Sequence, residues 1–576
     1  MGSRLHRKIQ GKMGADYHAE VPLRTQIDCD GFLLIVEGRA DGIFEQDGQT
    51  VIDEIKGVFR DVERMEEPDP VHLAQARCYA CIYAEQQNLE KIGVQMTYAN
   101  LDTEEIRRFS SSYTRSELEK WFTHLTEVYQ KWAQMQLEWK AERKASIGKT
   151  VFPYPYREGQ KDLAAAVYRT IWHGKKLFIQ APTGVGKTLS TVFPAVQAVG
   201  QELGDKIFYL TAKTITRTVA EEAFSLLKKQ GLHYKVLTLT AKEKICFCEE
   251  PDCNPEKCPY ARGHFDRVND AVYELLTSYE ENSANYSRER IMEQAEKWKV
   301  CPFEMALDVS LWSDAIICDY NYVFDPQAKL KRFFAEGVKG DYLFLIDEAH
   351  NLVERGREMY SATLYKEDFL EVKRFLKPFS RKAVAALERG NKYLLEWKRE
   401  CGEYTLLSNI DSFALNLFNV SHALEQLLED RESVMNRPST DSEIEEGKKK
   451  TLDFYFQVRA FLEIYEELDD SYEIYVQHDR EGRFALKLYC IHTADKIGQC
   501  LEKGRASILF SATLLPVQYY MELLSGKSED YAVYARSTFD PARKKVLLGL
   551  DVSTKYTRRT PAEYQKIASY IRQITD

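Results

Sequence analysis

One eight-residue segment constrains the fold of this 576-residue chain more than any other. The sequence APTGVGKT, Ala181–Thr188, follows a short apolar stretch, KLFIQ, and precedes an apolar run that is typical of a buried helix. Gly184 and Gly186 permit a tight turn in which backbone N–H groups approach a phosphate at the start of that helix. A strand, a phosphate-binding turn and a helix in this order predict an α/β domain with a parallel sheet.

The same segment predicts an ATP site that holds Mg²⁺. Lys187 is placed to reach the β and γ phosphates, and the Thr188 hydroxyl is placed to hold the metal ion. Because such a loop wraps the phosphates with its backbone, we assign the whole segment to nucleotide binding. Its residues are Ala181, Pro182, Thr183, Gly184, Val185, Gly186, Lys187 and Thr188.

A second apolar stretch, YLFLI, ends in the acidic pair Asp347 and Glu348. Asp347 is expected to complete the binding of Mg²⁺, and Glu348 to orient or deprotonate the attacking water. Both halves of an ATP-hydrolysing site therefore occur in the required order, with Lys187 and Glu348 as its catalytic residues.

The charge and the N-terminus restrict the class of protein. The formal net charge is −10, which argues against a polycation that coats nucleic acid but leaves room for a local basic groove. No stretch of the sequence is long and apolar enough to cross a membrane. The first residues, MGSRLHRKIQ, lack the apolar core of a secretory signal. We expect a cytoplasmic protein.

Five of the twelve cysteines crowd between positions 246 and 301. In a large intracellular protein this crowding favours metal ligation over disulfides. Four thiolates suit either a zinc ion or an iron–sulfur cluster, so the residue types alone leave both open.

Four motifs resemble those of superfamily-two helicases. APTGVGKT, LTAKTITR (Leu210–Arg217), DEAH (Asp347–His350) and SAT (Ser511–Thr513) look like motifs I, Ia, II and III. The cysteine insert before DYNYVFDP and the insert between DEAH and SAT resemble the XPD/DinG branch. The resemblance implies ATP-driven 5′→3′ translocation on single-stranded DNA, in DNA repair or processing. It also implies that His350 couples the nucleotide to motif III, through Ser511 and Thr513, and that Gln160 lies near the nucleotide.

The resemblance also favours a [4Fe–4S] cluster over zinc. The family places a cluster at this point of the chain, and its last ligand begins a sequence like CPFEMA, which here starts at Cys301. The implied ligands are Cys246, Cys253, Cys258 and Cys301. Cys248 is a spare thiol that is able to replace Cys246.

A second pattern near the N-terminus predicts a different chemistry. In VIDEIKG, Glu54 and Lys56 are two residues apart on a strand, so their side chains face the same side. Asp41 of VEGRADG lies across the expected hairpin and is able to join them. Two carboxylates that hold Mg²⁺ beside an ammonium group suit phosphodiester hydrolysis.

The surroundings of this pattern resemble the RecB-type branch of the PD-(D/E)XK nucleases. His6 lies upstream, and Gln75 and Tyr79 lie on the following helical stretch. The resemblance implies that His6 is a further metal ligand beside Asp41 and Glu54. His18 and Glu20 remain alternative ligands.

The order of these segments predicts several domains. After SATLLP, neither ARSTFDPARKKV nor KYTRRTPAEYQK resembles the family's second-domain arginine motif, so we expect a C-terminally truncated motor. An arginine finger typically contributes 10³–10⁵ in rate, so this chain alone is expected to bind ATP but hydrolyse it poorly. A second chain is then expected to supply the missing domain. The expected domains are the nuclease with a C-terminal helix (1–145), the RecA-like ATP-binding domain (150–245, 302–351 and 500–520), the iron–sulfur insertion (246–301), a helical arch-type insertion (352–499) and the start of a second motor domain (521–576).

Two functions follow from this organisation. The first is an ATP-dependent DNA helicase coupled to a metal-dependent DNA nuclease. The alternative is a nucleotide-gated platform for single-stranded DNA in which the nuclease alone is catalytically active.

Overall fold

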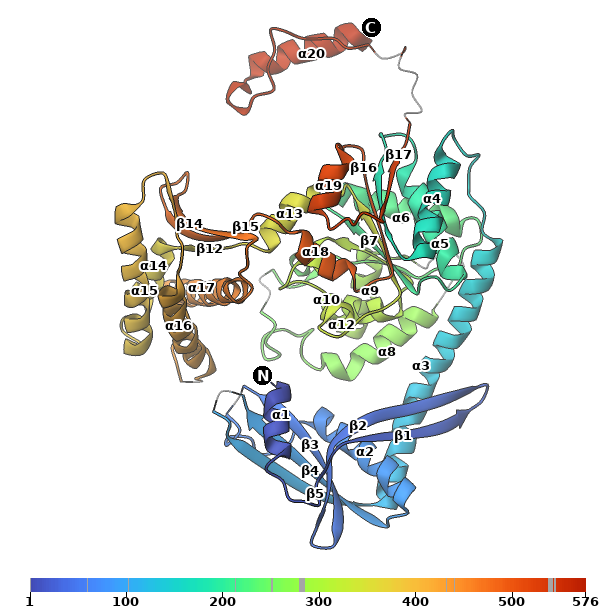
Figure 1. Ribbon diagram of the computed structural model, residues 1–576, viewed down its shortest axis with the longest axis vertical. Helices are drawn as coiled ribbons and strands as arrows, with labels where there is room; N and C mark the ends of the chain where they lie inside the picture. The colour runs from blue at the N-terminus through green and yellow to red at the C-terminus, as the bar shows by residue number, and fades with distance from the viewer. Residues whose placement is uncertain are drawn as a thin grey trace. The chain divides into compact units, whose positions relative to one another are not determined.

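The computed structural model describes residues 2–59, 61–101, 103–212, 214–249, 252–278, 285–430, 432–439, 441–536, 542 and 545–575 (Figure 1). The chain divides into two compact units, Met1–Ala141 and Glu142–Asp576. Among the described residues, no helix combines the length and apolar character needed to cross a membrane.

The first unit is built on a sheet that has the order β1-β2-β3-β4-β5 in its described residues. β1, β2 and β3 form an antiparallel meander, whereas β3 and β4 are parallel and are joined by helix α2. Ile52 of β3 and Val94 of β4 are fully buried in its core. The elements are α1 (Gly2–Gln10), β1 (His18–Cys29), β2 (Phe32–Gln46), β3 (Gln49–Val58), α2 (Pro70–Gln87), β4 (Lys91–Asn100), β5 (Ile106–Thr114) and α3 (Arg115–Lys149).

The second unit contains the predicted parallel sheet. Every pair of neighbouring strands recorded in it is parallel, so the carboxyl ends of the strands meet at one edge. Its strands, in sheet order, are β17 (Tyr531–Tyr534), β6 (Lys176–Gln180), β16 (Ala506–Ser511), β11 (Tyr342–Asp347), β7 (Lys206–Thr211), β10 (Ala315–Asp319), β8 (Val236–Thr238) and β9 (Asn285–Tyr286).

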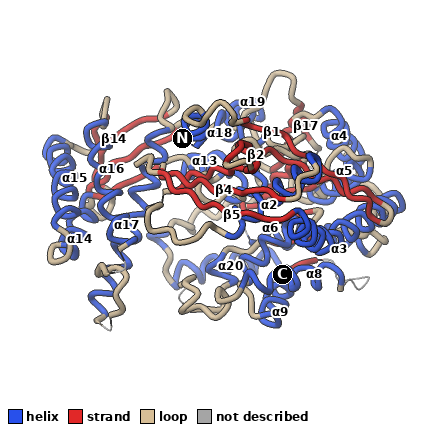
Figure 2. Tube along the Cα trace, turned by 90° about the horizontal axis from the view of Figure 1, so that it is seen from below, coloured by secondary structure: helices blue, strands red, loops and turns tan. Residues whose placement is uncertain are grey.

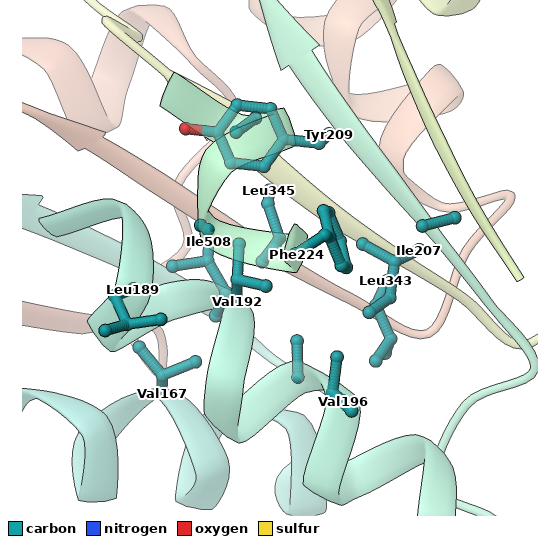
Figure 3. Close-up of a cluster of buried hydrophobic side chains, with 14 of the residues drawn as sticks. Val167, Leu189, Val192, Val196, Ile207, Tyr209, Phe224, Leu343, Leu345 and Ile508 are labelled. Atoms are coloured by element: carbon teal, nitrogen blue, oxygen red, sulfur yellow. The ribbon is translucent and has the colours of Figure 1, made fainter. Parts of the chain in front are cut away.

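Apolar side chains hold this sheet to its helices. Figure 3 shows Val192 and Val196 of helix α5 beside Leu345 of β11, and all three are fully buried. The alternating apolar residues of the strands thus provide the surface on which the helix after the phosphate loop packs. The helices of this part are α4 (Gln160–His173), α5 (Lys187–Gly200), α6 (Thr214–Lys228), α7 (Lys242–Ile245), α8 (His264–Thr277), α9 (Arg288–Trp298), α10 (Pro302–Trp312), α11 (Asn321–Phe324), α12 (Lys331–Phe334) and α19 (Val517–Leu523).

The parallel sheet of the second unit extends beyond the domain boundaries expected from the sequence. β9 lies inside the stretch assigned to the cysteine insertion, yet it pairs with β8. β17 lies after residue 520, yet it pairs with β6. Both strands are too short to give a distinct alternating pattern in the sequence, since they have two and four residues. Farther along the chain lie η2 (Tyr556–Arg558) and α20 (Pro561–Thr575).

The insertion between DEAH and SAT contains a sheet as well as helices. We expected a mostly helical segment, but four short strands form an antiparallel sheet in the order β12-β15-β14-β13 within the described residues. Figures 1 and 2 show this sheet together with α14 to α17 as a lobe with its own core. The elements are α13 (Asn351–Met359), β12 (Ala362–Tyr365), α14 (Lys366–Leu376), α15 (Arg381–Glu400), β13 (Tyr404–Leu406), α16 (Asp411–Glu429), α17 (Ser442–Glu466), β14 (Tyr472–His478), β15 (Phe484–Cys490) and α18 (Ala494–Leu501).

Candidate nucleotide, cysteine and carboxylate sites

The phosphate loop joins the end of β6 to the start of α5. Gly184 and Gly186 have φ angles of +88° and +76°, which favour glycine because a side chain is strained there. A Cβ atom added to Gly186 would also lie 2.5 Å from Nε2 of Gln160. Gln160 therefore packs directly on the loop, which agrees with the position expected for it. The Lys187 ammonium donates a hydrogen bond to the carbonyl of Ala181, at 3.1 Å.

A cavity of about 570 Å³ opens over this loop. Lys187, Thr188, Asp347 and Glu348 line it together, so the two halves of the expected ATP site meet. Arg157 also lines the cavity and donates a hydrogen bond to the carbonyl of Gly184, at 2.5 Å. Arg157 was missed by the sequence reasoning, although it stands three residues before Gln160 in the segment YREGQ.

Asp347 is held by two hydrogen bonds at the end of β11. Tyr209 on β7 donates its hydroxyl proton to Oδ2 at 3.0 Å, and the Glu348 backbone N–H donates to Oδ1 at 2.9 Å. Burial raises the pKa of Asp347 to about 6. The Tyr209 hydroxyl also has a side-chain hydrogen bond with Thr188. One buried hydroxyl therefore links the two residues that we expect to hold Mg²⁺.

Glu348 is connected to the SAT segment by a chain of hydrogen bonds. The Ser511 hydroxyl donates to Oε2 of Glu348 at 2.9 Å and lies 2.7 Å from Nδ1 of His350. The Thr513 backbone N–H donates to the same hydroxyl, at 3.1 Å. Because a serine hydroxyl has one proton to donate, His350 carries its proton on Nδ1. Glu348 itself has a φ of +48°, which is uncommon for a residue other than glycine.

Motif Ia follows β7, with Lys213 outside the described residues. Arg217 of this motif lies 3.9 Å from Asp319 at the end of β10. Arg355 of α13 lies 3.5 Å from the same carboxylate, so Asp319 connects segments on either side of the cysteine insertion.

A second cavity, of about 330 Å³, is lined by cysteines. It brings together the four expected ligands and the spare thiol, which are Cys246, Cys248, Cys253, Cys258 and Cys301.

Polar groups surround these thiols. Cys301 precedes α10, and its sulfur accepts hydrogen bonds from the backbone N–H groups of Phe303 and Glu304. The side chain of Lys242 is hydrogen-bonded to the side chain of Cys253, and this contact raises the pKa of the lysine. Cys248 interacts with Cys246 and Cys258, and its pKa is raised to about 11 by burial first and then by these neighbours.

Four further cysteines, Cys318, Cys401, Cys490 and Cys500, do not line this cavity. Cys318 on β10 and Cys490 on β15 are fully buried. The sulfur of Cys500 lies 3.6 Å from the hydroxyl of Tyr360, and that of Cys401 lies 3.7 Å from the carbonyl of Val476.

The residues expected in the nuclease form one connected group in the first unit. Asp41 Oδ2 accepts a hydrogen bond from the Ile55 backbone N–H at 2.7 Å, and Oδ1 lies 3.6 Å from Nδ1 of His6. The Lys56 ammonium lies 2.8 Å from Oε1 of Glu54. This pair confirms that Glu54 and Lys56 face the same side of β3.

Helix α2 completes the group. Lys56 also donates to Oε1 of Gln75 at 2.9 Å, and Gln75 donates to the hydroxyl of Tyr79 at 3.0 Å. The Tyr79 ring lies against the backbone of β2, where a Cβ atom on Gly38 would come within 2.6 Å of it. This close approach explains why Gly38, the first glycine of VEGRADG, has no side chain.

Glu54 has a buried carboxylate oxygen that lacks a hydrogen-bond partner among the described residues. Its side chain is 3% exposed, and no described residue hydrogen-bonds to its Oε2. Burial, followed by the charge of Asp41, raises the pKa of Glu54 to about 7. The pKa of His6 is also raised, mainly by its interaction with Asp41.

The remaining expected residues lie outside this group or outside the described chain. Glu20 accepts a hydrogen bond from Gln10 at 3.1 Å and lies 3.5 Å from Arg39. Arg558 lies 3.6 Å from Glu563, and ARSTFDPARKKV falls partly outside the described residues. Across the described residues, no three His, Cys, Asp or Glu side chains are placed to hold a single metal ion.

The phosphate loop and the DEAH box line one cavity of a parallel α/β domain, and the SAT segment is hydrogen-bonded to Glu348 at its edge. This arrangement is typical of nucleotide-dependent motor domains. The family model DEAD_2 matches residues 214–369, and the DEAD/DEAH box helicase model matches residues 158–246. These two matched ranges together span residues 158–369, and over them the chain is similar to superfamily-two helicases of the XPD/DinG type. The first unit lies outside both matched ranges.

Three relatives illustrate this likeness. The XPD/RAD3 helicase subunit of general transcription and DNA repair factor IIH from Saccharomyces cerevisiae is 24% identical over 246 residues, which are 35% of this chain and 30% of that protein. The ATP-dependent DNA helicase YoaA from Escherichia coli is 17% identical over 453 residues, which are 75% of this chain and 71% of that protein. A solved XPD helicase structure has a TM-score of 0.42, at 19% identity, over 73% of this chain and 70% of its own. The chain thus spans less than a third of the first of these relatives.

Proposed function

We propose that this chain is an ATP-dependent DNA helicase of the XPD/DinG/YoaA type, acting in DNA repair or processing. The observation that carries the proposal is the hydrogen-bonded connection of Glu348 to Ser511 and His350. This connection links Glu348, the expected hydrolytic carboxylate, to the SAT segment, which follows the second insertion in the sequence. Translocation on single-stranded DNA in the 5′→3′ direction is the form of the activity that the family resemblance favours.

The side chains around the cavity divide the work of ATP hydrolysis. Lys187 and the loop N–H groups bind the phosphates, while Thr188 and Asp347 would hold Mg²⁺, which offsets phosphate charge when bound. Glu348 orients the attacking water and accepts its proton. Ser511 and His350 hold the Glu348 carboxylate in place, so they belong to the positioning residues.

DNA-dependent ATP hydrolysis and strand displacement test this function. Lys187→Ala removes the phosphate cation and Glu348→Gln removes the proton acceptor, so both are expected to reduce ATP turnover by at least 100-fold. Glu348→Gln should still bind ATP, because its amide keeps the shape of the side chain. Equal turnover in Glu348→Gln and the unmodified chain, at equal ATP occupancy, would contradict the proposal.

We also propose that Cys246, Cys253, Cys258 and Cys301 hold a [4Fe–4S] cluster. A tetrahedral zinc ion ~2.3 Å from each sulfur would draw the four sulfurs to within roughly 4 Å of one another. The described cysteines instead surround a cavity of about 330 Å³, and no three of them are placed for a single ion. A four-iron cluster separates its ligands by the width of its own core, and it is the group that the family resemblance favours in this cavity. When bound, such a cluster would supply a rigid cross-link and a one-electron redox centre.

The chemical content of the anaerobically purified chain tests the cluster. Iron and sulfide are expected in about a 1:1 ratio, with broad visible absorbance that is lost in Cys258→Ser. Cys248→Ser is the matched control, because this thiol lies in the same cavity but is not among the four assigned ligands. Zinc without sulfide would contradict the cluster.

A second activity is proposed for the first unit, namely metal-dependent DNA cleavage. The supporting observation is Glu54, a buried carboxylate that has an unpartnered oxygen beside Asp41, His6 and Lys56. Asp41 and Glu54 would hold Mg²⁺, which activates water and offsets charge on the phosphodiester. His6 lies 3.6 Å from Asp41 but is not placed with both carboxylates around one ion, so water would complete the shell of the metal. Lys56 is held by a hydrogen bond to Gln75 and would contact the same phosphate.

Point variants separate the two activities. Lys56→Ala is expected to lower DNA cleavage by 100-fold or more and to leave ATP binding unchanged, whereas Lys12→Ala, on the exposed surface of the same unit, should leave both unchanged. If Lys187→Ala leaves cleavage intact and no strand displacement is found, the chain is the nucleotide-gated DNA-binding platform. Strand displacement that appears when a second motor domain is added as a separate chain would favour the helicase and a two-chain assembly.

A further inference from the structure

His264 is a buried histidine that has one unexplained nitrogen. It is the first residue of α8, it is 4% exposed, and it lies among the residues that line the cysteine cavity. Its Nε2 is buried, and no described residue hydrogen-bonds to that atom. Buried polar atoms nearly always have a partner, so an orphaned ring nitrogen beside a cavity calls for one.

The backbone fixes the proton of this ring. The Cys301 backbone N–H donates a hydrogen bond to Nδ1 of His264, at 3.2 Å. A backbone N–H is only able to donate, so Nδ1 presents its lone pair and the ring proton lies on Nε2. The orphaned atom is therefore a hydrogen-bond donor, and its missing partner must be an acceptor.

The charged groups nearby do not bond to this nitrogen. Asp308 and Glu304 are the two carboxylates whose charge acts on His264, and neither is hydrogen-bonded to Nε2. The carboxylate of Asp308 pairs instead with Arg332 at 2.9 Å. The Cys301 sulfur accepts from the backbone N–H groups of Phe303 and Glu304. Because Nε2–H has no partner among the described residues and His264 lines the cavity, an acceptor that occupies the cavity would complete it.

We propose that Nε2–H of His264 donates a hydrogen bond to a sulfur of the cluster held in this cavity. This inference rests on the cluster proposed above and assigns His264 a positioning role, since it is not itself a ligand. Hydrogen bonds to cluster or ligand sulfur stabilise the more negative, reduced state, and so raise the reduction potential. His264 therefore links the last ligand, Cys301, to the electronic properties of the whole cluster.

Two substitutions divide the functions of the two ring nitrogens. His264→Asn keeps an acceptor near the position of Nδ1 but has no donor at the position of Nε2. His264→Gln places an amide N–H near the position of Nε2 and loses the acceptor for Cys301. Asn269→Ala is the matched control, because Asn269 is exposed on the same helix and does not line the cavity.

The test is a redox titration of the anaerobically purified full chain, followed by electron paramagnetic resonance. His264→Asn should retain iron and sulfide and make one-electron reduction about tenfold less favourable, which corresponds to about 59 mV. His264→Gln and Asn269→Ala should remain close to the unmodified chain. If His264→Asn loses its iron, a wild-type potential in His264→Gln still supports the proposal, and a lowered one overturns it.

Failure of this inference differs from failure of the cluster. Equal potentials in the unmodified chain and His264→Asn, at equal iron content, would overturn the role of His264 and leave the cluster standing. Absence of iron and sulfide from the unmodified chain would overturn both.

Discussion

Single hydroxyl groups organise the nucleotide site at the scale of the residue. Tyr209 connects Asp347 to Thr188, and Ser511 connects Glu348 to His350. Each hydroxyl comes from a strand next to the carboxylate that it holds. The acidic residues are thus oriented by buried neighbours rather than by solvent, which suits groups that must meet a metal ion or a water in one geometry.

Tyr209→Phe tests the first of these contacts. The change removes one buried hydrogen bond with a net worth of about 1 kcal/mol, so the affinity for Mg²⁺ with ATP is expected to fall about fivefold. A titration of fluorescent ATP analogue binding against Mg²⁺ measures it. Tyr234→Phe is the control, since Tyr234 is also fully buried but its hydroxyl has no partner among the described residues. Equal effects of the two variants would assign the loss to packing.

The buried carboxyl of Glu54 predicts a pH dependence of stability. Its pKa is raised from 4.5 to about 7, so the folded first unit binds more protons than the unfolded chain between these values and loses stability as the pH rises. Glu54→Gln should therefore stabilise the metal-free protein by up to about 3 kcal/mol at pH 8, with little effect at pH 4.5. Chemical denaturation at both pH values measures the difference. Glu20→Gln, on an exposed residue, should show neither effect.

At the scale of the element, the structure depends on how strands end. The phosphate loop, the DEAH box and the SAT segment each follow the carboxyl end of a neighbouring parallel strand, namely β6, β11 and β16. In the first unit, the antiparallel pairing of β2 with β3 brings Asp41 close to Glu54. In both cases the pairing of the strands brings together residues that are distant in the sequence.

Gly186→Ala tests the turn that precedes α5. The added Cβ would require a strained φ of +76° and would lie 2.5 Å from Gln160, so ATP affinity is expected to fall by more than tenfold. Removing the contact by also changing Gln160 to Ala should not restore binding, because the strain in the backbone remains. Isothermal titration with ATP measures both variants. Gly148→Ala on α3 meets nothing within 4 Å and should be neutral or stabilising.

Much of this arrangement follows from the sequence, and the omissions have physical reasons. The spacing of Glu54 and Lys56 predicted their shared face, and the apolar stretches before Ala181 and Asp347 predicted β6 and β11. The strands β9, β12, β13 and β17 were missed, because two to four residues give too little alternation. The strands β14 and β15 have seven residues each, and they were missed because they follow long helices in a segment that we expected to be mostly helical. Tyr209 and Arg157 were missed because their roles arise from the packing of strands and loops that the sequence does not place next to each other.

At the scale of the whole molecule, each compact unit has its own core and its own candidate sites. The core around Ile52 belongs to the first unit, which holds the carboxylate group, and the core around Val192 belongs to the second, which holds the nucleotide and cysteine cavities. Each candidate site is lined by residues of one unit alone. We therefore expect the carboxylate site and the nucleotide site to have independent sources of stability.

Calorimetry tests this independence. ATP with Mg²⁺ at 100 times its dissociation constant should stabilise the second unit by about 2.7 kcal/mol and leave the unfolding transition of the first unit in place. Ile52→Ala should lower only the other transition, by about 2–5 kcal/mol. Lys187→Ala identifies the ATP-sensitive transition by abolishing its shift. A single transition that moves as one in every variant would show that the units unfold together.

The Ser511 hydroxyl offers a simple means of signalling. It has one hydrogen, which it gives to Glu348, while His350 and Thr513 each give one to it. In the hydrolysis proposed above, Glu348 accepts a proton from water. The acceptor of the Ser511 hydrogen would then change from an anion to a neutral acid, and a charge-assisted bond would become an ordinary one. The hydrogen bond that ties the segment after β16 to Glu348 would thereby weaken at the moment when the phosphate bond breaks.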